Sequence, residues 1–259
     1  MIHELCVIDP GAKIGEEVEV GPFTHISGNV EIGDGTWIGS NVVIMDGARI
    51  GKNCKIFPGA VISAPPQDLK YKGEETFLVI GDNTIIRECC TLNRATTENF
   101  YTKIGKDCLL MAYVHVAHDC EVGDHCVLAN SVNLAGHVII QNHVILGGMV
   151  PVHQFVTVGE HSMVGGGSLV RKDVPPYIKA AREPLSYVGI NSIGLNRRGF
   201  KKEKVNLIND IYRILYVSGL NMTKAILEVE DLVPDCNEKT TILNFVRNSQ
   251  RGLIRGYNG

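Results

Sequence analysis

Aliphatic residues recur along the chain with a period of six. From Ile2 to Val170 every sixth residue is Ile, Leu or Val, except at Asp68, Glu74 and Glu98. The residue four places after each aliphatic position is usually small, and glycine often follows the aliphatic residue directly. An α-helix repeats every 3.6 residues and an amphipathic strand every two, so neither element explains this spacing.

A period of six fits a parallel β-helix in which three short strands close one coil. Each hexad covers one side of a triangular prism, three hexads make a coil of about 18 residues, and successive coils stack about 4.8 Å apart. We therefore predict a mostly β protein with a parallel β-helix over residues 1–176. The period fails in two polar segments, near 64–78 and 94–102, which we expect to leave the prism as loops.

The repeat stops at Pro175 and Pro176, since proline has no N–H to donate to a β ladder. We expect residues 177–200 to connect the β-helix to a different domain. In residues 201–259 apolar side chains recur at helical spacing in three stretches, which predicts a small C-terminal α-helical domain. Such a domain could cover the open end or the flank of the prism.

Composition and charge limit the class of protein. Hydrophobic residues make up 44% of the chain and charged residues 20%, as in globular proteins, and no apolar run reaches the roughly 20 residues that a membrane span needs. The N-terminus has no positive region before an apolar stretch, so we expect no secretory signal, a cytoplasmic location and no stable membrane insertion. The net charge is only −3, and a mildly basic C-terminal part suits an acidic protein partner; we expect no nucleic-acid partner.

Most cysteines fall on the small position of the repeat, which faces the interior. They are Cys6, Cys54, Cys90, Cys108, Cys120 and Cys126. No paired CxxC spacing is present, and a buried cysteine behaves as a small hydrophobic residue, so we interpret these six as core filler. Cys89 and Cys236 fall outside the pattern.

One set of histidines follows the coil length directly. His125, His143 and His161 are each 18 residues apart, so they should stack as a ladder on one edge of three successive coils. A metal site there is conceivable. Ligands on one straight ladder converge poorly on a tetrahedral ion, however, so we favour solvent-facing corner residues.

A second set of polar residues gathers on one strip of three consecutive coils. Its members are His115, His118, Asp119, Gly136, His137, His153 and Gln154. The 18-residue coil stacks His118, Gly136 and Gln154 directly and places Asp119 one coil from His137. Imidazoles, a carboxylate and amides on one strip favour an active site over a scatter of surface residues.

The segments that carry this strip, together with four others, resemble one protein family in the same order along nearly the whole chain. The segments are 67–71, 115–120, 134–137, 152–155, 173–177, 197–200 and 251–255. The family is the UDP-N-acetylglucosamine acyltransferases of lipid A biosynthesis, which are hexapeptide-repeat transferases. The resemblance implies a left-handed parallel β-helix with three hexapeptide repeats per coil.

The resemblance also implies an activity. These enzymes transfer a 3-hydroxyacyl chain from acyl carrier protein to the 3-hydroxyl of UDP-N-acetylglucosamine, which is the first step of lipid A biosynthesis. The donor is carried on the phosphopantetheine of the carrier protein, so we expect no further cofactor and no metal. The family implies a homotrimer with acyl carrier protein and UDP-N-acetylglucosamine as partners.

By the same resemblance, His118 is the general base, Asp119 orients it, and the backbone N–H of Gly136 stabilises the oxyanion. Neutral imidazole suits the role of base because its ordinary pKa is near 6.5. The implied substrate-binding residues are Asp68, Lys70, His115, His137, His153, Gln154, Asn191, Arg197 and Arg198. Met163 and Gly166 correspond to the region that limits acyl-chain length. Ile193 stands where the family commonly has Glu, which puts one polar nucleotide contact in doubt.

Three other functions stay open at this point. A zinc enzyme like the γ-carbonic anhydrases uses the same repeat with histidines at subunit interfaces, and another hexapeptide-repeat sugar acyltransferase could share the strip. A scaffold that binds through a flat side of the prism needs no strip at all.

Overall fold

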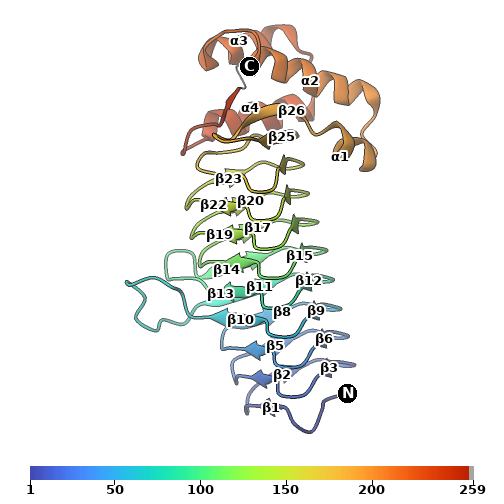
Figure 1. Cartoon of the computed structure of the whole chain (residues 1–259), viewed down its shortest axis with the longest axis vertical. Helices are drawn as coiled ribbons and strands as arrows, with labels where there is room; N and C mark the ends of the chain where they lie inside the picture. Colours follow the sequence, from blue (N-terminus) through green and yellow to red (C-terminus); the bar gives the residue numbers. More distant parts are fainter. Residues whose placement is uncertain (257–259) are drawn as a thin grey trace.

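The fold is a triangular prism of short parallel strands with helices at its C-terminal end (Figure 1). It is taken from a computed structural model in which residues 1–256 are described. Residues one coil apart pair in register, as Val7 does with His25 and Ile8 with Ile26. From Val20 to Val170 the aliphatic positions of the repeat face inward and are buried, Ile26, Ile38 and Ile44 among them, so the period of six is the period of the core. In the first coil Ile2 is exposed, and Ile8 and Ile14 are half-buried.

Three parallel sheets form the sides of the prism. The first sheet contains β1 (Val7–Ile8), β4 (His25–Ile26), β7 (Val43–Ile44), β10 (Val61–Ala64), β13 (Thr91–Asn93), β16 (His115–Val116), β19 (Asn133–Leu134) and β22 (Pro151–Val152). The second sheet contains β2 (Lys13–Ile14), β5 (Glu31–Ile32), β8 (Ala48–Ile50), β11 (Phe77–Ile80), β14 (Tyr101–Ile104), β17 (Glu121–Val122), β20 (Ile139–Ile140) and β23 (Thr157–Val158).

The third sheet is the longest. It contains β3 (Glu19–Val20), β6 (Trp37–Ile38), β9 (Lys55–Ile56), β12 (Ile85–Ile86), β15 (Leu109–Leu110), β18 (Val127–Leu128), β21 (Ile145–Leu146), β24 (Met163–Val164), β25 (Ile178–Ala181), β26 (Ser186–Ile190) and β27 (Arg255–Gly256). We call the edge between the first and second sheets the first corner, that between the second and third sheets the second corner, and the return to the first sheet the third corner.

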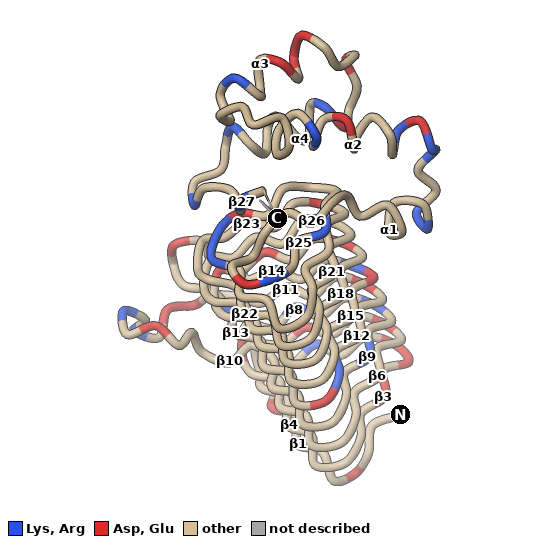
Figure 2. Tube along the Cα trace, turned by 45° about the horizontal axis from the view of Figure 1, so that its top comes forward, with Lys and Arg blue, Asp and Glu red and all other residues tan. Residues whose placement is uncertain are grey.

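The chain turns at each corner through a residue with positive φ. At the first corner these residues include Asp119 (φ 60°), His137 (φ 62°) and Phe155 (φ 64°). The left-handed conformation is uncommon for residues other than glycine, yet the tight turns impose it at most corners of the prism. Figure 2 shows Lys, Arg, Asp and Glu mainly at the corners, in the projecting loop and in the helical part. The corners are therefore where polar chemistry is presented.

Both expected loops leave the prism at the first corner. The first loop connects β10 to β11 and projects far from the prism (Figure 1), and the second loop connects β13 to β14 one coil later. Arg94 ties the two loops together, because its guanidinium donates to the Tyr71 hydroxyl through Nε (3.2 Å) and Nη2 (3.0 Å). Its Nη1 also donates to the carbonyl of Ser63 (3.0 Å).

The expected end of the β-helix at residue 176 needs correction. Strand β25 pairs in parallel with β24, Met163 facing Lys179, and β26 then pairs antiparallel with β25. Pro176 lies in the turn before β25, and Pro175 directly precedes that turn. Neither is part of a strand, so the missing N–H groups do not interrupt the sheet, which continues into the segment expected only to connect two domains.

Between β26 and β27 the described residues form four helices: α1 (Ser192–Arg197), α2 (Lys202–Tyr216), α3 (Met222–Leu232) and α4 (Asn237–Asn248). The apolar face of α2 is buried, and Tyr212 donates from its hydroxyl to the Pro176 carbonyl (2.6 Å). The small helical part predicted from the apolar spacing is confirmed, although residues 257–259 of that prediction lie outside the described residues. No helix in residues 1–256 is long and apolar enough to cross a bilayer.

Asp173 joins the C-terminal segment to the last coil. Its carboxylate is buried and accepts hydrogen bonds from the Thr157 amide (2.8 Å), the Ser249 hydroxyl (2.6 Å) and the Arg251 amide (3.3 Å). Its main chain bonds with Gly252 and Ile254 as well. One residue thus fixes where the segment after α4 returns to the prism.

The prediction for the cysteines is confirmed. Cys54, Cys90, Cys108, Cys120 and Cys126 are buried, and Cys6, in the first coil, is half-buried. All eight cysteines of the chain are free thiols. Burial raises the pKa of Cys120 to about 12 and that of Cys90 to about 11, which keeps these two side chains neutral and apolar.

Candidate active site

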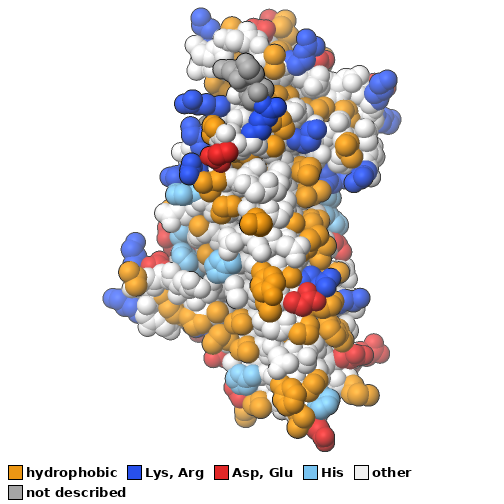
Figure 3. Space-filling view, in the orientation of Figure 1, with side chains coloured by type: hydrophobic (Ala, Val, Ile, Leu, Met, Phe, Trp, Pro, Cys, Tyr) orange, Lys and Arg blue, Asp and Glu red, His pale blue; other side chains and the backbone are white. Residues whose placement is uncertain are grey.

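The polar strip forms at the first corner, on the three coils that follow the two loops. His118 and Asp119 lie between β16 and β17, and the next two coils place Gly136 and then Gln154 at the equivalent position. The stacking is close, because a Cβ on Gly136 would lie 2.8 Å from Cε1 of His118. The neighbours predicted from the 18-residue spacing are therefore neighbours in space. In Figure 3, histidine side chains gather beside the projecting loop.

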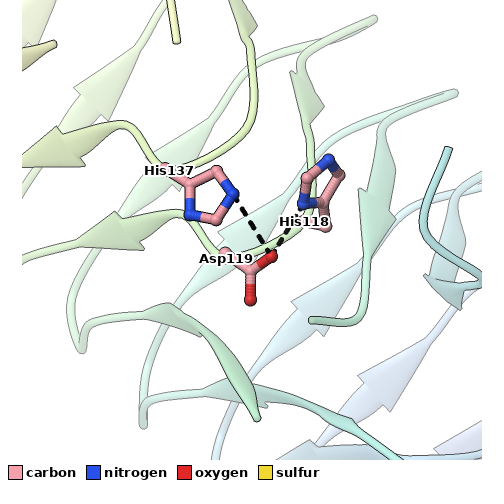
Figure 4. Close-up of side chains that lie close together, drawn as sticks. All are labelled: His118, Asp119 and His137. Atoms are coloured by element: carbon pink, nitrogen blue, oxygen red, sulfur yellow. Dashed lines mark hydrogen bonds and ion pairs between the residues drawn. The ribbon is translucent and has the colours of Figure 1, made fainter. Parts of the chain in front are cut away.

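His118 and Asp119 form a hydrogen-bonded dyad (Figure 4). The His118 Nδ1 lies 2.7 Å from Oδ2 of Asp119, and the carboxylate is buried while the imidazole side chain keeps 14% of its surface exposed. With Nδ1 facing a carboxylate, the tautomer that carries its proton on Nδ1 is favoured. That leaves Nε2 unprotonated and able to accept a proton.

His137 approaches the same carboxylate from the next coil. Its Nε2 lies 3.7 Å from Oδ2 of Asp119 and 3.7 Å from Oε2 of Glu98 (Figure 4 shows the first of these contacts). The imidazole rings of His118 and His137 are perpendicular, with centroids 5.3 Å apart. Phe155 stacks on the His137 ring with centroids 4.6 Å apart, so two aromatic rings pack against His137.

Thr96, on the second loop, contacts both oxygens of Asp119. Its amide donates to Oδ1 (3.1 Å) and its hydroxyl to Oδ2 (2.7 Å). The sequence does not predict this contact. The interruption of the six-residue period locates the second loop, but it does not indicate which side chain of the loop turns inward. Thr96 lies two residues before Glu98, where the aliphatic period is interrupted, and nothing in the surrounding sequence distinguishes it from other loop residues.

Burial and hydrogen bonding oppose each other at Asp119. Burial raises the pKa of the carboxyl, but the hydrogen bonds from His118 and Thr96 together with the nearby His137 outweigh it and lower the pKa below its ordinary value. The carboxylate is therefore ionised at neutral pH. A buried anion with three donor groups around it is suited to stabilise a transient imidazolium.

A cleft of about 660 Å³ opens in front of this dyad. Residues of the first loop line one side, including Asp68 and Lys70, while His118, His137 and Gln154 line the other. The first loop thus brings its two predicted residues to the strip although they are about 50 positions earlier in the chain. His115 and His153 do not line this cleft.

His115 is part of β16 in the first sheet, His153 directly follows β22 of the same sheet, and each has its own partner. His115 shares a hydrogen bond with the hydroxyl of Thr91 at 2.8 Å, and burial lowers its pKa. His153 has its Nδ1 3.2 Å from a guanidinium nitrogen of Arg251, in the segment that Asp173 anchors. They extend the strip away from the dyad along the first sheet.

The predicted nucleotide-binding residues lie at the second corner. Arg198 donates to the carbonyl of His143 (2.8 Å), and its Nη1 is buried with no hydrogen-bond partner among the described residues. Asn191 is buried and caps α1, because its side chain accepts from the Gly194 amide (3.2 Å) and donates to the His161 carbonyl (2.9 Å). Arg197 is exposed. Within one chain these residues are separated from the dyad by the width of the second sheet.

The two residues predicted to limit chain length lie on the third side. Met163 is part of β24 in the third sheet, and Gly166 follows it at the third corner. A Cβ on Gly166 would lie 3.1 Å from the carbonyl oxygen of Gly148, one coil below, so a larger residue would have to displace that backbone or project outward.

The predicted histidine ladder exists at the second corner. The rings of His125 and His143 stack at 4.8 Å and those of His143 and His161 at 4.6 Å, with Tyr177 continuing the stack at 5.5 Å. The expectation that all three histidines face solvent is wrong for His161, whose Nδ1 is buried. Burial, with His143 and Arg198 nearby, lowers the pKa of His161 to about 4.

The dyad and His137 also form a candidate metal group, since one possible ligand atom from each lies within 4.8 Å of the others. Two ligands about 2.0–2.1 Å from a tetrahedral zinc ion lie roughly 3.3 Å apart. The 2.7 Å separation of Nδ1 and Oδ2 is shorter than this and fits a hydrogen bond instead. The geometry favours an acid–base pair over a zinc centre.

Comparison with protein families gives matches along the chain. Residues 173–254 match the family described as Udp N-acetylglucosamine O-acyltransferase, domain 2. Residues 29–64 and 101–136 match the bacterial transferase hexapeptide (six repeats) family. The two matches correspond to the C-terminal part and to two stretches of the prism.

Relatives match over nearly their whole length. The acyl-(acyl-carrier-protein)-UDP-N-acetylglucosamine O-acyltransferase of Chlorobium phaeobacteroides is 57% identical over 260 residues, which covers 99% of this chain and 98% of that protein. The solved UDP-N-acetylglucosamine acyltransferase of Bacteroides fragilis is 51% identical with a TM-score of 0.97, covering 98% of this chain and 100% of that one.

A more distant solved structure keeps the same fold. The UDP-N-acetylglucosamine acyltransferase of Arabidopsis is 33% identical with a TM-score of 0.86, covering 98% of this chain and 100% of that one. The left-handed β-helix expected from the resemblance is confirmed by these neighbours. The chain therefore belongs to the family of acyl-(acyl-carrier-protein)-UDP-N-acetylglucosamine O-acyltransferases.

Proposed function

We propose that this protein transfers a 3-hydroxyacyl chain from acyl carrier protein to the 3-hydroxyl of UDP-N-acetylglucosamine, the first step of lipid A biosynthesis. The observation that carries the proposal is the buried His118–Asp119 dyad, which faces a cleft beside Gly136 in a chain of this family. The reaction needs one group that can accept a proton near neutral pH and return it later.

His118 is the group that moves the proton. Its Nε2 accepts the proton of the sugar 3-hydroxyl while the hydroxyl oxygen attacks the thioester carbonyl, forming a new C–O bond and a tetrahedral oxyanion. Asp119 keeps the Nδ1 proton in place and stabilises the positive charge that develops on the imidazole. When the C–S bond breaks, the thiolate of the carrier takes the proton from Nε2, and the base is regenerated.

Gly136 supplies the donor for the oxyanion. Among residues 1–256 its N–H donates to no protein acceptor, and it lies one coil from His118. A preorganised donor of this kind contributes roughly 3 kcal/mol to transition-state stabilisation. The absence of a Cβ matters, because a side chain there would meet the imidazole of the base.

The other residues bind the two substrates. In the cleft, Asp68, Lys70, His137 and Gln154 surround the place where the sugar must lie for its 3-hydroxyl to reach His118. His115 and His153 extend this surface toward the first sheet. Arg197 and Arg198, with Asn191, hold the uridine diphosphate, since guanidinium groups match phosphate geometry. Met163 and Gly166 border the acyl chain.

The proposed sugar-binding residues lie at the first corner, the nucleotide-binding residues at the second corner, and the acyl-chain residues on the third side of the prism. A single chain therefore cannot apply all of them to one substrate molecule, whereas neighbouring copies that present different corners to each other can. This separation supports a homotrimer with its sites between subunits. Sedimentation should give a species of three chains at assay concentrations, and an active monomer would contradict this part of the proposal.

Acyl carrier protein is the proposed acyl donor, with its phosphopantetheine arm as the only carrier of the chain and no further cofactor. The basic residues of the C-terminal part suit an acidic surface. A cytoplasmic location remains the prediction from the N-terminal sequence.

A mass-resolved acyl transfer assay tests the activity directly. Purified protein is supplied with UDP-N-acetylglucosamine and with carrier proteins charged with 3-hydroxyacyl chains of graded length. We expect a 3-O-acylated sugar nucleotide and a preference for one length. Binding of both substrates without any product would support the scaffold function instead.

Metal analysis separates the proposal from the zinc-enzyme alternative. We expect full activity after treatment with a chelator. Stoichiometric zinc in the purified protein, with activity lost on chelation and regained on adding zinc, would favour the alternative.

A further inference from the structure

We infer that Thr96 is a positioning residue for acyl transfer: its hydroxyl and its amide hold the Asp119 carboxylate where that carboxylate can orient the His118 imidazole. The inference rests on the proposed function. It assigns a role in the reaction to the second loop, which separates two strands without contributing any residue of the strip.

The hydrogen bonds to Asp119 fix both torsion angles of its side chain. The Asp119 main chain is held by its own amide, which donates to the buried Thr102 hydroxyl (2.8 Å). Thr96 then binds one oxygen through its amide and the other through its hydroxyl, at 3.1 and 2.7 Å. Two donors from one residue on two oxygens define the plane of the carboxylate, and that plane sets the direction from which Oδ2 meets Nδ1 of His118.

The direction of the threonine proton is also fixed. The Thr96 hydroxyl accepts a hydrogen bond from the amide of Glu98 (3.3 Å). A hydroxyl has one proton, and with the Glu98 amide on its lone pair the proton is left for the acceptor on the other side, which is Oδ2 of Asp119. Thr96 thus acts as a donor to the carboxylate and does not compete with it for the proton of His118.

This donor affects where the proton resides during the reaction. Oδ2 of Asp119 is shared between the Thr96 hydroxyl and Nδ1 of His118, and the carboxylate has no exposure to water. A carboxylate that accepts several hydrogen bonds has a lower affinity for a proton of its own. The proton on Nδ1 therefore stays on the imidazole when Nε2 takes the second one, as general base catalysis requires.

Further hydrogen bonds position the second loop around Thr96. The Phe100 amide donates to the carbonyl of Thr96 (2.9 Å), the Asn99 side chain donates to the carbonyl of Asp119 (3.5 Å), and the Arg94 amide donates to Ala64 at the base of the first loop (2.9 Å). Hydrogen bonds from residues before and after Thr96 in the sequence hold it in place. The position of Thr96 next to Asp119 therefore does not depend only on its bonds to the carboxylate.

A purely local role for Thr96 has to be distinguished from this one. The bond from the Glu98 amide to the Thr96 hydroxyl is a common way of closing a turn, which many serines and threonines serve in loops. If that were all, replacing Thr96 would change stability and leave the His118–Asp119 pair as it is. The experiment therefore needs measurements that report on the pair.

The test compares Thr96→Val with Thr96→Ser and with Thr97→Val in the full-length protein. Valine keeps the shape and removes the hydroxyl, and serine keeps the hydroxyl. Thr97 is an exposed neighbour that lines the cleft but makes none of the contacts to Asp119. We expect Thr96→Val to lower kcat about 10- to 100-fold with KM changed less than about threefold, since the loss concerns orientation of the base. Thr96→Ser should remain within about threefold of wild type, and Thr97→Val should keep the wild-type kcat and change KM alone, because Thr97 lines the cleft without contacting Asp119.

A spectroscopic signature gives the second measurement. The Nδ1 proton of His118, between imidazole and carboxylate, should give a low-field proton NMR resonance that is absent in His118→Ala. We expect the resonance in wild type, Thr96→Ser and Thr97→Val, and its displacement or loss in Thr96→Val. If Thr96→Val does not fold, Thr96→Ala, with a smaller side chain, takes its place in both measurements.

The outcomes separate the inference from the proposed function. An unchanged kcat and an unchanged resonance in Thr96→Val, with or without a lower melting temperature, would overturn the positioning role and leave Thr96 as a turn residue. Equal losses in Thr96→Val and Thr96→Ser would overturn it too, because the hydroxyl would not be the cause. Wild-type protein that makes no acylated product contradicts the proposed function, whereas the resonance still tests the contact.

Discussion

Two histidine clusters occupy two corners of the same prism, and they differ in what surrounds them. At the second corner, His125, His143 and His161 stack face to face, and the carboxylate of Asp107 lies 3.7 Å from His125 at the exposed end of the stack. At the first corner, His118 and His137 stand perpendicular to each other with Asp119 bonded to the first and near the second. Both clusters are placed by the same 18-residue period.

The difference shows that a corner imidazole becomes reactive through its neighbours. A ring stacked between two other rings has lost part of its water and gained no partner for a positive charge, so protonation of His161 is disfavoured. A ring bonded to a buried anion and open to a cleft can accept a proton and release it. The two loops add to this difference, because they lie at the first corner, line its cleft and hold the Asp119 carboxylate through Thr96.

The largest effect in this comparison is expected at the dyad. His118→Ala should lower kcat more than 100-fold, because no other described group in the cleft combines an imidazole with a hydrogen-bonded carboxylate. The melting temperature and the oligomeric state should not change. Initial rates, thermal unfolding and sedimentation measure all three. Retention of more than a few per cent of the activity would show that another base performs the step.

A smaller loss is expected when the space beside the base is filled. The added methyl group in Gly136→Ala would lie 2.8 Å from Cε1 and 3.0 Å from Nε2 of His118, so the imidazole has to move. We expect kcat/KM to fall about 10- to 100-fold with little change in stability, because a displacement of the order of 1 Å is costly for a base. Steady-state kinetics and thermal unfolding test this. An alanine variant with wild-type rates would mean that the coils separate to accommodate the methyl group.

The ladder should affect stability and its pH dependence. In the folded protein the pKa of His161 is about 4, below the ordinary value near 6.5, so the unfolded chain binds this proton first as pH falls. The free energy of unfolding should therefore fall between pH 7 and 5, with His161 contributing about 1–2 kcal/mol after allowance for its partial exposure. His161→Phe keeps the stack and should weaken this dependence. Denaturant unfolding at both pH values measures it, and an equal slope in wild type and variant would contradict the assignment.

The smallest effect is expected at the exposed end of the ladder. His125 keeps 45% of its side-chain surface exposed and stacks on one ring only, so His125→Phe should change stability by less than about 0.5 kcal/mol and leave acyl transfer unaltered. The same measurements at pH 7 serve as the control for His161→Phe. A large loss of activity here would mean that the second corner takes part in the reaction beyond Arg197 and Arg198.

The period of six was sufficient to predict the prism, its core and the stacking of residues 18 apart. It placed Ile26 and Cys90 inside, and it brought His118 next to Gly136. This works because each inward side chain has one neighbour above and one below at a fixed spacing, so sequence distance converts directly into position. A globular fold without repeats offers no such conversion.

Residues outside the period were less accessible to prediction. Thr96 contacts Asp119 from a loop whose path depends on Arg94 and Tyr71, and no spacing rule describes that path. The continuation of the sheet beyond Pro176 was not predicted. Proline ends a strand only where its missing N–H is needed for pairing, and the sequence does not show that Pro176 lies in a turn before β25. The burial of His161 depends on Tyr177 and Phe200, which pack on it from the segment after the repeat.

The two loops leave the repeat without shifting it. Ile62 pairs with Leu92 and Ile80 with Ile104, so the aliphatic slots on both sides of each loop keep the same phase. The prism accepts additional chain at this corner in whole multiples of its repeat unit, and the coils above and below keep the same packing. The chain at this corner can therefore vary in length by whole repeats while the buried column of aliphatic side chains stays as it is.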